Sequence, residues 1–251
     1  GWTVPVWDNL TDFTGLTRIE WRTQDLSDLN HLDLVESWVD RGPNGVDCVA
    51  AGSSRPVYRT DGALGPTVRF DGTDDRLVSA GGAGIDMSGG LTIFSVFRWD
   101  SFVNGNGPFS AYEDGASGTS YMTSLSVNDA TAKKIWLYAN QGSTVSDGNW
   151  RAEGSEQNDT THQIVSIEVD AVNPSDSPWF QNGVAITVTE GGTMVKPGPE
   201  NFDIFVLGAA RNNATSHNGD LDMLVYYYGR KMTTAEIAKI NSEINAIYGV
   251  Y

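Results

Sequence analysis

The C-terminal segment, Asn218 to Tyr251, constrains the fold more than any other part of the sequence. It reads as a strand of aliphatic and aromatic residues, Leu221 to Tyr228, followed by a short turn and one helix. Thr233 and Glu236 have the spacing of a capping box, and Gly249 stands where a left-handed residue usually ends a helix. The apolar face of this helix consists of Ile237, Ile240, Ile244, Ile247 and Tyr248. Such a face must pack on another hydrophobic surface, so we expect the rest of the chain to supply a sheet.

The preceding chain has the pattern of an antiparallel sandwich, with short hydrophobic segments separated by turns and no regular alternation of strand and helix. Leu91 to Asp100 is apolar on both faces, which is typical of a central strand covered on each side. Gln163 to Asp170 alternates, so we expect one face to pack on the core and the other to meet solvent. Asn182–Gly183 predicts a tight hairpin. The predicted fold is all-β, with one short C-terminal α-helix, in a single domain over residues 16–251 that follows an N-terminal arm, residues 1–15.

The charge of the chain narrows the choice of partners. It has 32 acidic and 16 basic residues, a net charge of −16 and a pI of about 4.3. Nucleic acid and anionic membranes are therefore poor partners, because both require a basic surface. Cys48 is the single cysteine, so no intramolecular disulfide forms, and we expect it to be a small buried hydrophobe. No apolar run is long enough to insert into a membrane.

Four segments, in order along the chain, resemble the laminin G-like jelly rolls of the concanavalin A-like lectin and glucanase superfamily, in particular its bacterial and phage branch. Glu20 to Ser27 is similar to the opening tryptophan strand and Asp-Leu-Ser loop. Ser37 to Gly45 is similar to the W-x-D-x-S-G-N-G segment, with Pro43 intruding. Val68 to Leu77 resembles the F-D-G hairpin, and Gly219 to Ile237 resembles the closing strand and L-T-x-x-E-I motif, with methionine in place of leucine.

This resemblance implies a concanavalin A-like jelly-roll sandwich, found in extracellular, cell-surface or virion-surface proteins. It leaves the function open, because the fold carries lectins, hydrolases, lyases, adhesion modules and virion components.

The catalytic motifs of the superfamily are incomplete in this chain. Its glycosidases use Glu-x-Asp-x-x-Glu on a strand, and the nearest match is Glu168 and Asp170, with Asn173 in the third place. The two carboxylates fall on one strand face and could polarise a sugar hydroxyl, although a solvated polar face has the same pattern. The lyase motif has its nearest counterpart at His162-Gln163, in the wrong order. We therefore expect no enzymatic activity.

Calcium is the most plausible cofactor, because it prefers oxygen ligands from loops. The candidate ligands fall in a tight turn and at the start of the closing strand, and they are Asp71, Asp74, Asp75, Asp220 and Asp222. Acidic residues in turns are also ordinary turn formers, and this alternative stays open. The three histidines and one cysteine form no zinc-ligand pattern.

Aromatic residues are the other candidates for ligand binding, because sugar rings stack on exposed aromatic faces. Trp136 and Tyr138 share a strand face, and Trp150 lies beside polar residues that favour its exposure. The alternative is that these rings fill the core of the sandwich.

The sequence therefore favours a non-catalytic carbohydrate-binding or adhesion module that recognises a glycan, such as a cell-surface polysaccharide, through aromatic and polar rim residues, with or without calcium. The alternative is a structural surface protein, such as a phage virion decoration or tail component, that docks on neighbouring subunits through its N-terminal arm. A polysaccharide hydrolase or lyase is the third hypothesis.

Overall fold

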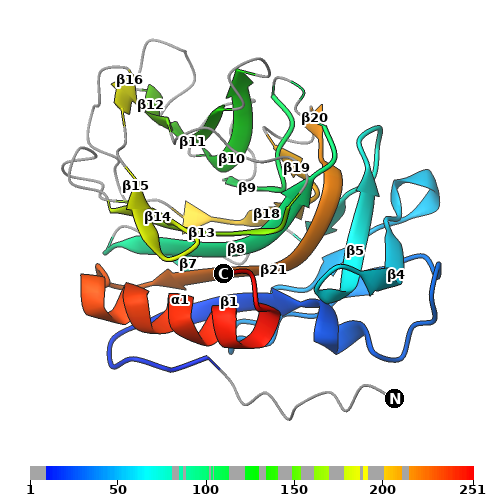
Figure 1. The fold of residues 1–251 in the computed structure, drawn as a ribbon, viewed down its shortest axis with the longest axis horizontal. Coiled ribbons are helices and arrows are strands. Elements are labelled where there is room, and N and C mark those ends of the chain that lie inside the picture. The colour runs from blue at the N-terminus through cyan, green and yellow to red at the C-terminus, as the bar shows by residue number, and fades with distance from the viewer. Residues whose placement is uncertain are drawn as a thin grey trace.

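The protein is a two-sheet sandwich with one helix packed on its outside (Figure 1). The computed structural model describes residues 10–80, 85–86, 89–101, 103, 105–112, 122–129, 134–140, 149–153, 161–169, 178–186, 189–191, 201–210 and 215–251. The all-β antiparallel sandwich and the short C-terminal helix predicted from the sequence are confirmed.

The sheet nearer the helix, here called the helix-side sheet, has eight strands. In spatial order they are β15 (Val184–Ile186), β14 (Trp179–Gln181), β13 (Gln163–Val169), β8 (Leu91–Trp99), β21 (Asn218–Tyr228), β5 (Gly65–Asp71) and β4 (Val57–Gly62), with β1 (Thr17–Arg22) also paired to β21. Strand β21 is thus central, with β8 along one side and β5 and β1 sharing the other.

The opposite sheet, here called the outer sheet, has nine strands. In spatial order they are β16 (Thr189–Gly191), β12 (Asn149–Glu153), β11 (Lys134–Asn140), β10 (Met122–Asp129), β9 (Phe109–Tyr112), β18 (Ile204–Leu207), β6 (Leu77–Ser79), β3 (Cys48–Val49) and β2 (Ser37–Trp38). The remaining elements are the strand pairs β7 (Ile85–Asp86) with β17 (Asn201–Phe202) and β19 (Ala209–Ala210) with β20 (Thr215–Ser216), and the 3-10 turns η1 (Thr23–Leu26) and η2 (Gly52–Ser54).

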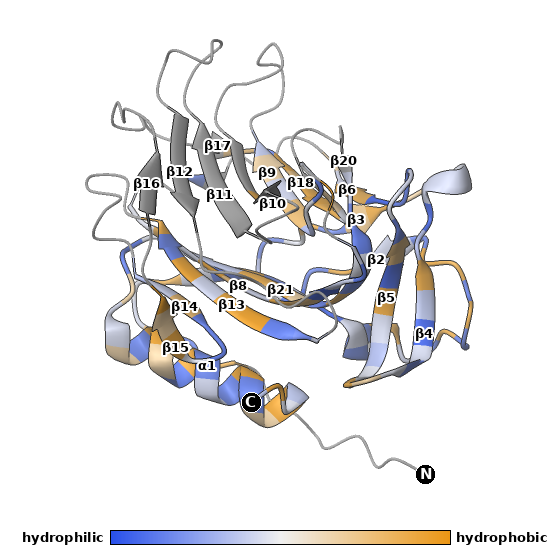
Figure 2. Ribbon diagram, turned by 45° about the horizontal axis from the view of Figure 1, so that its top comes forward, coloured by the Kyte–Doolittle hydropathy of each residue, from blue (hydrophilic) through white to orange (hydrophobic). Residues whose placement is uncertain are grey.

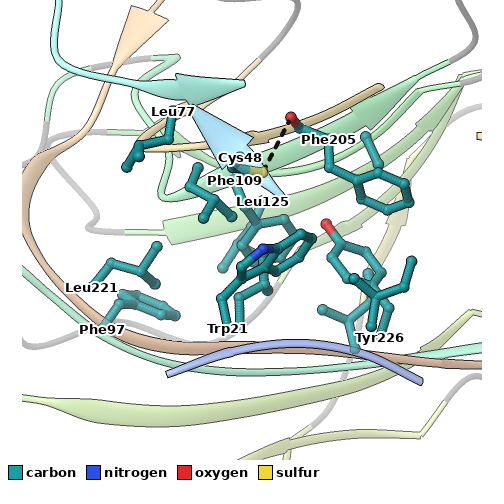
Figure 3. Packing of buried hydrophobic residues seen from close by; sticks show 14 of the residues in the cluster. Trp21, Cys48, Leu77, Phe97, Phe109, Leu125, Phe205, Leu221 and Tyr226 are labelled. Atoms are coloured by element: carbon teal, nitrogen blue, oxygen red, sulfur yellow. Dashed lines mark hydrogen bonds between the residues drawn. The ribbon is translucent and has the colours of Figure 1, made fainter. Parts of the chain in front are cut away.

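The main hydrophobic core lies between the two sheets (Figure 3). Trp21 and Tyr226 from the helix-side sheet meet Phe109 and Phe205 from the outer sheet, with rings 5.3–6.4 Å apart in tilted or edge-on contacts. Cys48 is fully buried in this core, and burial raises its pKa well above the ordinary value, so it behaves as the expected small hydrophobe.

A second core lies between the helix-side sheet and α1 (Thr234–Tyr248). Figure 2 shows both hydrophobic and hydrophilic residues along α1, which is the pattern of a helix with one face on a sheet. Its buried face packs on outward-facing side chains of β8 and β21, which include Phe94, Val96, Met223 and Val225. The helix-side sheet is therefore covered on both faces.

The predicted ends of α1 are confirmed. The Thr233 hydroxyl accepts a hydrogen bond from the backbone N–H of Glu236, and the Glu236 carboxylate accepts one from the Thr233 N–H. Gly249 has a φ of 62°, and its N–H donates to the Asn245 carbonyl. In the described part of the chain, no helix has the length and apolar character needed to cross a membrane.

The expectation that one face of Gln163–Asp170 meets solvent is wrong for the described strand, β13, whose residues are all buried. Helix α1 covers the polar face, and Asn241 Nδ2 donates to Ser166 Oγ over 2.8 Å. The carboxylate of Glu168 forms an ion pair with Lys231 at 2.9 Å. Alternating polar residues on a strand can therefore face a polar residue of a covering helix as well as solvent.

The described part of the N-terminal arm, Leu10 onward, packs on its own domain. Thr11 Oγ1 donates to Glu243 of α1 over 2.6 Å, and Tyr227 Oη donates to the Thr11 carbonyl. Phe13 contacts the ring of Tyr227 edge-on. These contacts hold this end of the arm along the helix.

Candidate functional site

Two cavities are candidates for ligand binding in the described part of the protein. The first, here called the helix cleft, lies between α1 and the β14–β15 hairpin and has a volume of about 350 Å³. The second, here called the polar pocket, lies over β4, β5, β8 and β21 of the helix-side sheet and has a volume of about 210 Å³. The helix cleft falls within the range of roughly 300–1,000 Å³ that is typical of small-molecule sites.

The hairpin wall of the helix cleft depends on the turn at Asn182–Gly183. These residues have φ values of 50° and 73°, the left-handed conformation of a two-residue hairpin turn. Asn182 also fixes the turn to the adjacent strand β13, because its Oδ1 accepts a hydrogen bond from the Ile164 N–H over 2.9 Å. A Cβ on Gly183 would lie 2.6 Å from the Tyr251 hydroxyl oxygen, so a larger residue would displace the exposed Tyr251 ring, and the φ of 73° favours glycine by itself.

Tyr251 forms another wall of the cleft, and Asn245 positions it. The Asn245 side chain binds the Tyr251 backbone twice, accepting from its N–H over 2.9 Å and donating to its carbonyl over 2.6 Å. The side chain of Tyr251 lies against Gly183 and remains 53 % exposed. The cleft therefore presents an aromatic side chain that is open to solvent, on a backbone that Asn245 holds in place.

The lining of the helix cleft is uncharged. It contains two aromatic rings, aliphatic groups, three side-chain amides and two hydroxyls, supplied by Phe180, Asn182, Gly183, Val184, Ala238, Asn241, Ser242, Asn245 and Tyr251. No Asp, Glu, Lys or Arg is among these described lining residues, although charged residues make up 19% of the chain. This combination suits a ligand with an apolar face and several neutral hydrogen-bonding groups.

The polar pocket is built around Asp220. Strand β21 lies between β5 and β8, and Asp220 pairs with Arg69 on one side and Arg98 on the other. Arg98 donates to Asp220 Oδ2 from Nε over 2.9 Å and from Nη2 over 2.6 Å, and Arg69 Nη1 donates to Oδ1 over 3.1 Å. Burial alone would raise the pKa of Asp220, but these two arginines hold it below its ordinary value. Asp220 is therefore a fixed, ionised acceptor.

The rim of the polar pocket is more exposed. Arg59 of β4 donates to both carboxylate oxygens of Asp61 over 2.9 Å, and these hydrogen bonds lower the pKa of Asp61. The turn residues Gly62 and Ala63 and the buried Thr67 complete the lining.

A buried acid–histidine pair lies close to Asp220. His162 Nε2 is 3.1 Å from Asp222 Oδ2 and 4.0 Å from Asp220 Oδ2. Burial raises the pKa of Asp222, and the neighbouring His162 offsets part of that shift. Because Asp222 is almost inaccessible, it supports the pocket from below instead of lining it.

The acidic turn after β5 brings three predicted calcium ligands together. One carboxylate oxygen from each of Asp71, Asp74 and Asp75 lies within 4.8 Å of the others. Asp75 is almost fully buried and accepts a hydrogen bond from the Asp71 N–H over 2.9 Å. Burial, together with the charges of Asp71 and Asp74, raises the pKa of Asp75 to about 6. This arrangement could hold a calcium ion, and calcium binding stays a prediction.

The other predicted site residues do not gather with this turn. Asp220 is taken up by its two arginines, and Asp222 lies beside His162. Glu168 is buried against Lys231. Asp170 and the side chains of three aromatic candidates lie outside the described residues, and those candidates are Trp136 and Tyr138 on β11 and Trp150 on β12. Their proposed contacts with a glycan stay predictions.

The sequence reasoning missed the helix cleft and the arginines of the polar pocket. The hairpin signal at Asn182–Gly183 and the polar residues Asn241 and Asn245 of the helix were visible, but their proximity was not. Arg69 and Arg98 each sit between apolar residues of a strand, and this placement was the available signal for a charged group on the outward face.

Comparison with known proteins identifies the fold. No protein-family model matches this sequence, and no curated protein sequence matches it. Trypanosoma rangeli sialidase in complex with sialic acid aligns with a TM-score of 0.58 at 13% identity, over 94% of this chain and 34% of that one. This chain thus spans about a third of that sialidase.

Two further solved structures align over most of this chain. Domain 4 of AbnA, a GH43 extracellular arabinanase from Geobacillus stearothermophilus, in complex with arabinotriose, aligns with a TM-score of 0.53 at 16% identity, over 84% of this chain and 100% of that domain. The binding domain of botulinum neurotoxin DC in complex with SialylT has a TM-score of 0.53 at 12% identity, over 84% of this chain and 51% of that one. At these identities the likeness concerns the fold, and the predicted laminin G-like family stays a prediction.

Proposed function

We propose that the protein is a non-catalytic glycan-binding domain of an extracellular or cell-surface protein, and that it holds an uncharged sugar in the helix cleft. The observation that carries this proposal is the lining of the cleft, which combines aromatic rings with amide and hydroxyl groups and no charged side chain. A neutral sugar has the matching chemistry, because its ring has apolar C–H faces and its edge carries hydroxyls that donate and accept hydrogen bonds.

The rigidity of the cleft supports this proposal. The backbone of Tyr251 is held by two hydrogen bonds to the Asn245 side chain, and the hairpin is held by the side chain of Asn182. A preformed site binds with less loss of conformational entropy than a flexible one. Two of the similar folds, the arabinanase domain and the sialidase, are structures of sugar complexes, which is consistent with a sugar as the ligand.

The carboxylates near the polar pocket favour a binding role over glycoside hydrolysis. A glycosidase needs two accessible carboxyl groups, one of them protonated and facing the scissile bond. Asp220 is held ionised by Arg69 and Arg98, and Asp222 is almost inaccessible.

The structural-protein alternative depended on an N-terminal arm that docks on neighbouring subunits. Residues 10–15 contact their own domain and residues 1–9 lie outside the described residues, so that alternative stays a prediction, and we develop the glycan-binding proposal.

A glycan array of neutral oligosaccharides, followed by calorimetry on the best ligand, tests the proposal. Tyr251→Ala removes the exposed ring and is expected to weaken binding about tenfold or more, as loss of an aromatic anchor usually does. Ala238→Trp places a large ring in the cleft from the exposed face of α1 and is expected to abolish binding. Val49→Ala is the matched control, because Val49 is an equally exposed apolar residue outside the cleft.

Two results would count against the proposal. If wild-type protein binds a neutral glycan and both cleft variants bind it equally well, the site lies elsewhere on the surface. If incubation with a polysaccharide releases reducing ends or unsaturated sugars, the domain is an enzyme and the non-catalytic assignment is wrong.

A further inference from the structure

The polar pocket has a charge distribution that the proposed neutral-glycan site does not explain. The chain has only 16 basic residues against 32 acidic ones, yet two arginines line this pocket and a third lies next to it, bound to Asp220. They are Arg59 of β4, Arg69 of β5 and Arg98 of β8. Three aspartates pair with these arginines, so an anionic ligand can bind a guanidinium here only by replacing one of those carboxylates.

The inner part of the pocket is neutral and fixed. Arg69 and Arg98 each pair with both Asp100 and Asp220, so two cations face two anions. The side chain of Asp220 is only 5% exposed, and breaking its pairs would leave a buried charge uncompensated. These four groups therefore keep their partners when a ligand enters, and Asp220 remains at the pocket wall as an acceptor for a hydroxyl group.

The rim pair, Arg59 with Asp61, is different, because its carboxylate is replaceable. The side chains of Arg59 and Asp61 are 38% and 54% exposed, and ion pairs this exposed are weak. A carboxylate brought by a ligand could thus take the place of Asp61 on Arg59 at little cost.

We propose that the polar pocket is a second binding site, and that it takes one sugar residue carrying a carboxylate, such as a uronic acid. The carboxylate binds Arg59 in place of Asp61, at the exposed rim of the pocket. A hydroxyl of the same sugar donates to Asp220, the acceptor at the pocket wall. The volume of about 210 Å³ limits the site to a single residue or a chain end.

The site is tested by calorimetry of the whole chain with D-glucuronate. D-glucose serves as a control ligand without the charge, and acetate as a control ligand that has the carboxylate but no sugar ring. We expect glucuronate to bind more tightly than either, and added salt to weaken its binding. Arg59→Gln is expected to reduce glucuronate affinity about tenfold or more, because it removes a charged hydrogen-bond donor. Asp61→Asn is expected to raise the affinity about threefold, because it removes the internal competitor for Arg59.

Arg55→Gln is the matched control, since Arg55 forms a comparable exposed ion pair with Glu36 outside the pocket, and it should leave binding unchanged. Melting curves of each variant confirm that it folds. The proposal is overturned if glucuronate does not bind, if glucose or acetate binds equally well, or if Asp61→Asn weakens binding. It is separable from the neutral-glycan proposal, because Tyr251→Ala should leave glucuronate binding intact even where it abolishes binding in the helix cleft.

Discussion

At the scale of single residues, Asp75 makes the stability of the protein depend on pH in an unusual direction. Its pKa is about 6 in the folded protein, against an ordinary value of 3.8. The folded state therefore holds a proton that the unfolded state has lost, so this residue lowers stability as the pH rises from about 4 to about 6. Asp75→Asn should remove the penalty while keeping an acceptor for the Asp71 N–H.

In a metal-free buffer with EDTA, we expect Asp75→Asn to be more stable than wild type by about 1 kcal/mol at neutral pH, below the full value of the pKa shift because solvent screens its neighbours. The difference should disappear below about pH 4. Urea unfolding at both pH values measures it, with the exposed Asp28→Asn as control. A variant less stable than wild type at neutral pH would show that Asp75 stabilises the turn as a carboxylate.

Calcium gives a second test of the same turn. An ion held by Asp71, Asp74 and Asp75 would favour the ionised carboxylates, so millimolar calcium should raise the melting temperature of the wild type at neutral pH. Asp75→Asn should abolish that increase. A melting temperature that calcium leaves unchanged would contradict the calcium prediction.

His217 gives the stability of the protein the opposite pH dependence, because it lowers the free energy of unfolding as the pH falls through about the same range. It is buried between the rings of Phe70 and Trp99, and burial lowers its pKa to about 4 from an ordinary value of 6.5. As the pH falls, His217 is protonated in the unfolded chain before it is protonated in the folded protein. This residue therefore lowers the stability by up to about 3 kcal/mol as the pH falls from about 6.5 to about 4.

We expect His217→Gln to lose stability at neutral pH but to show a flatter dependence of unfolding free energy on pH across this range. Denaturant titrations at a series of pH values measure the slope, and the exposed His31→Gln is the control. An unchanged slope in His217→Gln would show that another group is responsible for acid destabilisation.

At the scale of elements, the capping box decides where α1 begins. The Thr233 hydroxyl and the Glu236 carboxylate each satisfy a backbone N–H at the first turn, and Arg230 adds two hydrogen bonds to Glu236 over 2.6 and 3.0 Å. These bonds from Arg230 lower the pKa of Glu236 to about 2, so the box stays intact in mildly acidic solution. Stability from Glu236 is present above its unfolded pKa and is lost as the pH falls toward 2.

Thr233→Ala should destabilise the protein by about 1 kcal/mol, because the first turn loses its side-chain acceptor. Thermal or urea unfolding measures the change, and the adjacent Thr234→Ala is the matched control, since Thr234 is the first residue of the helix and not its cap. Equal effects of the two substitutions would show that the cap contributes nothing specific.

At the scale of the whole molecule, two hydrophobic cores share one sheet. Leu125 belongs to the core between the sheets, and Ile240 to the core under α1. Strands β8 and β21 contribute side chains to both cores, so the loss of either core removes packing from strands on which the other core depends. We therefore expect the described domain to unfold in a single cooperative transition.

Leu125→Ala and Ile240→Ala should each destabilise that one transition by about 3 kcal/mol, as is usual for loss of a large buried side chain. Near-UV and far-UV circular dichroism and calorimetry should give coincident melting curves for both variants. A separate low-temperature transition in Ile240→Ala would show instead that α1 unfolds independently of the sandwich.

Local patterns in the sequence were sufficient for much of the fold. The ends of α1, the hairpin at Asn182–Gly183 and the central strand at Leu91–Trp99 follow from capping, turn conformation and apolar periodicity. Each depends on residues close together in the chain, so the sequence alone determines them. The short strands β4 and β9 escaped prediction, because their few residues lack a clear alternation and are fixed by neighbouring strands.

Only the tertiary structure decided the two cavities, whereas the acidic turn with Asp71, Asp74 and Asp75 is local and follows from the sequence. Asp220 meets Arg69 and Arg98 because β21 inserts between β5 and β8, although these strands are more than a hundred residues from it in the chain. The helix cleft likewise forms because α1 docks beside a hairpin from a distant part of the sequence. Strand order and helix docking depend on the packing of the whole core, so the sequence by itself determined the elements, and their assembly decided which polar residues face a ligand.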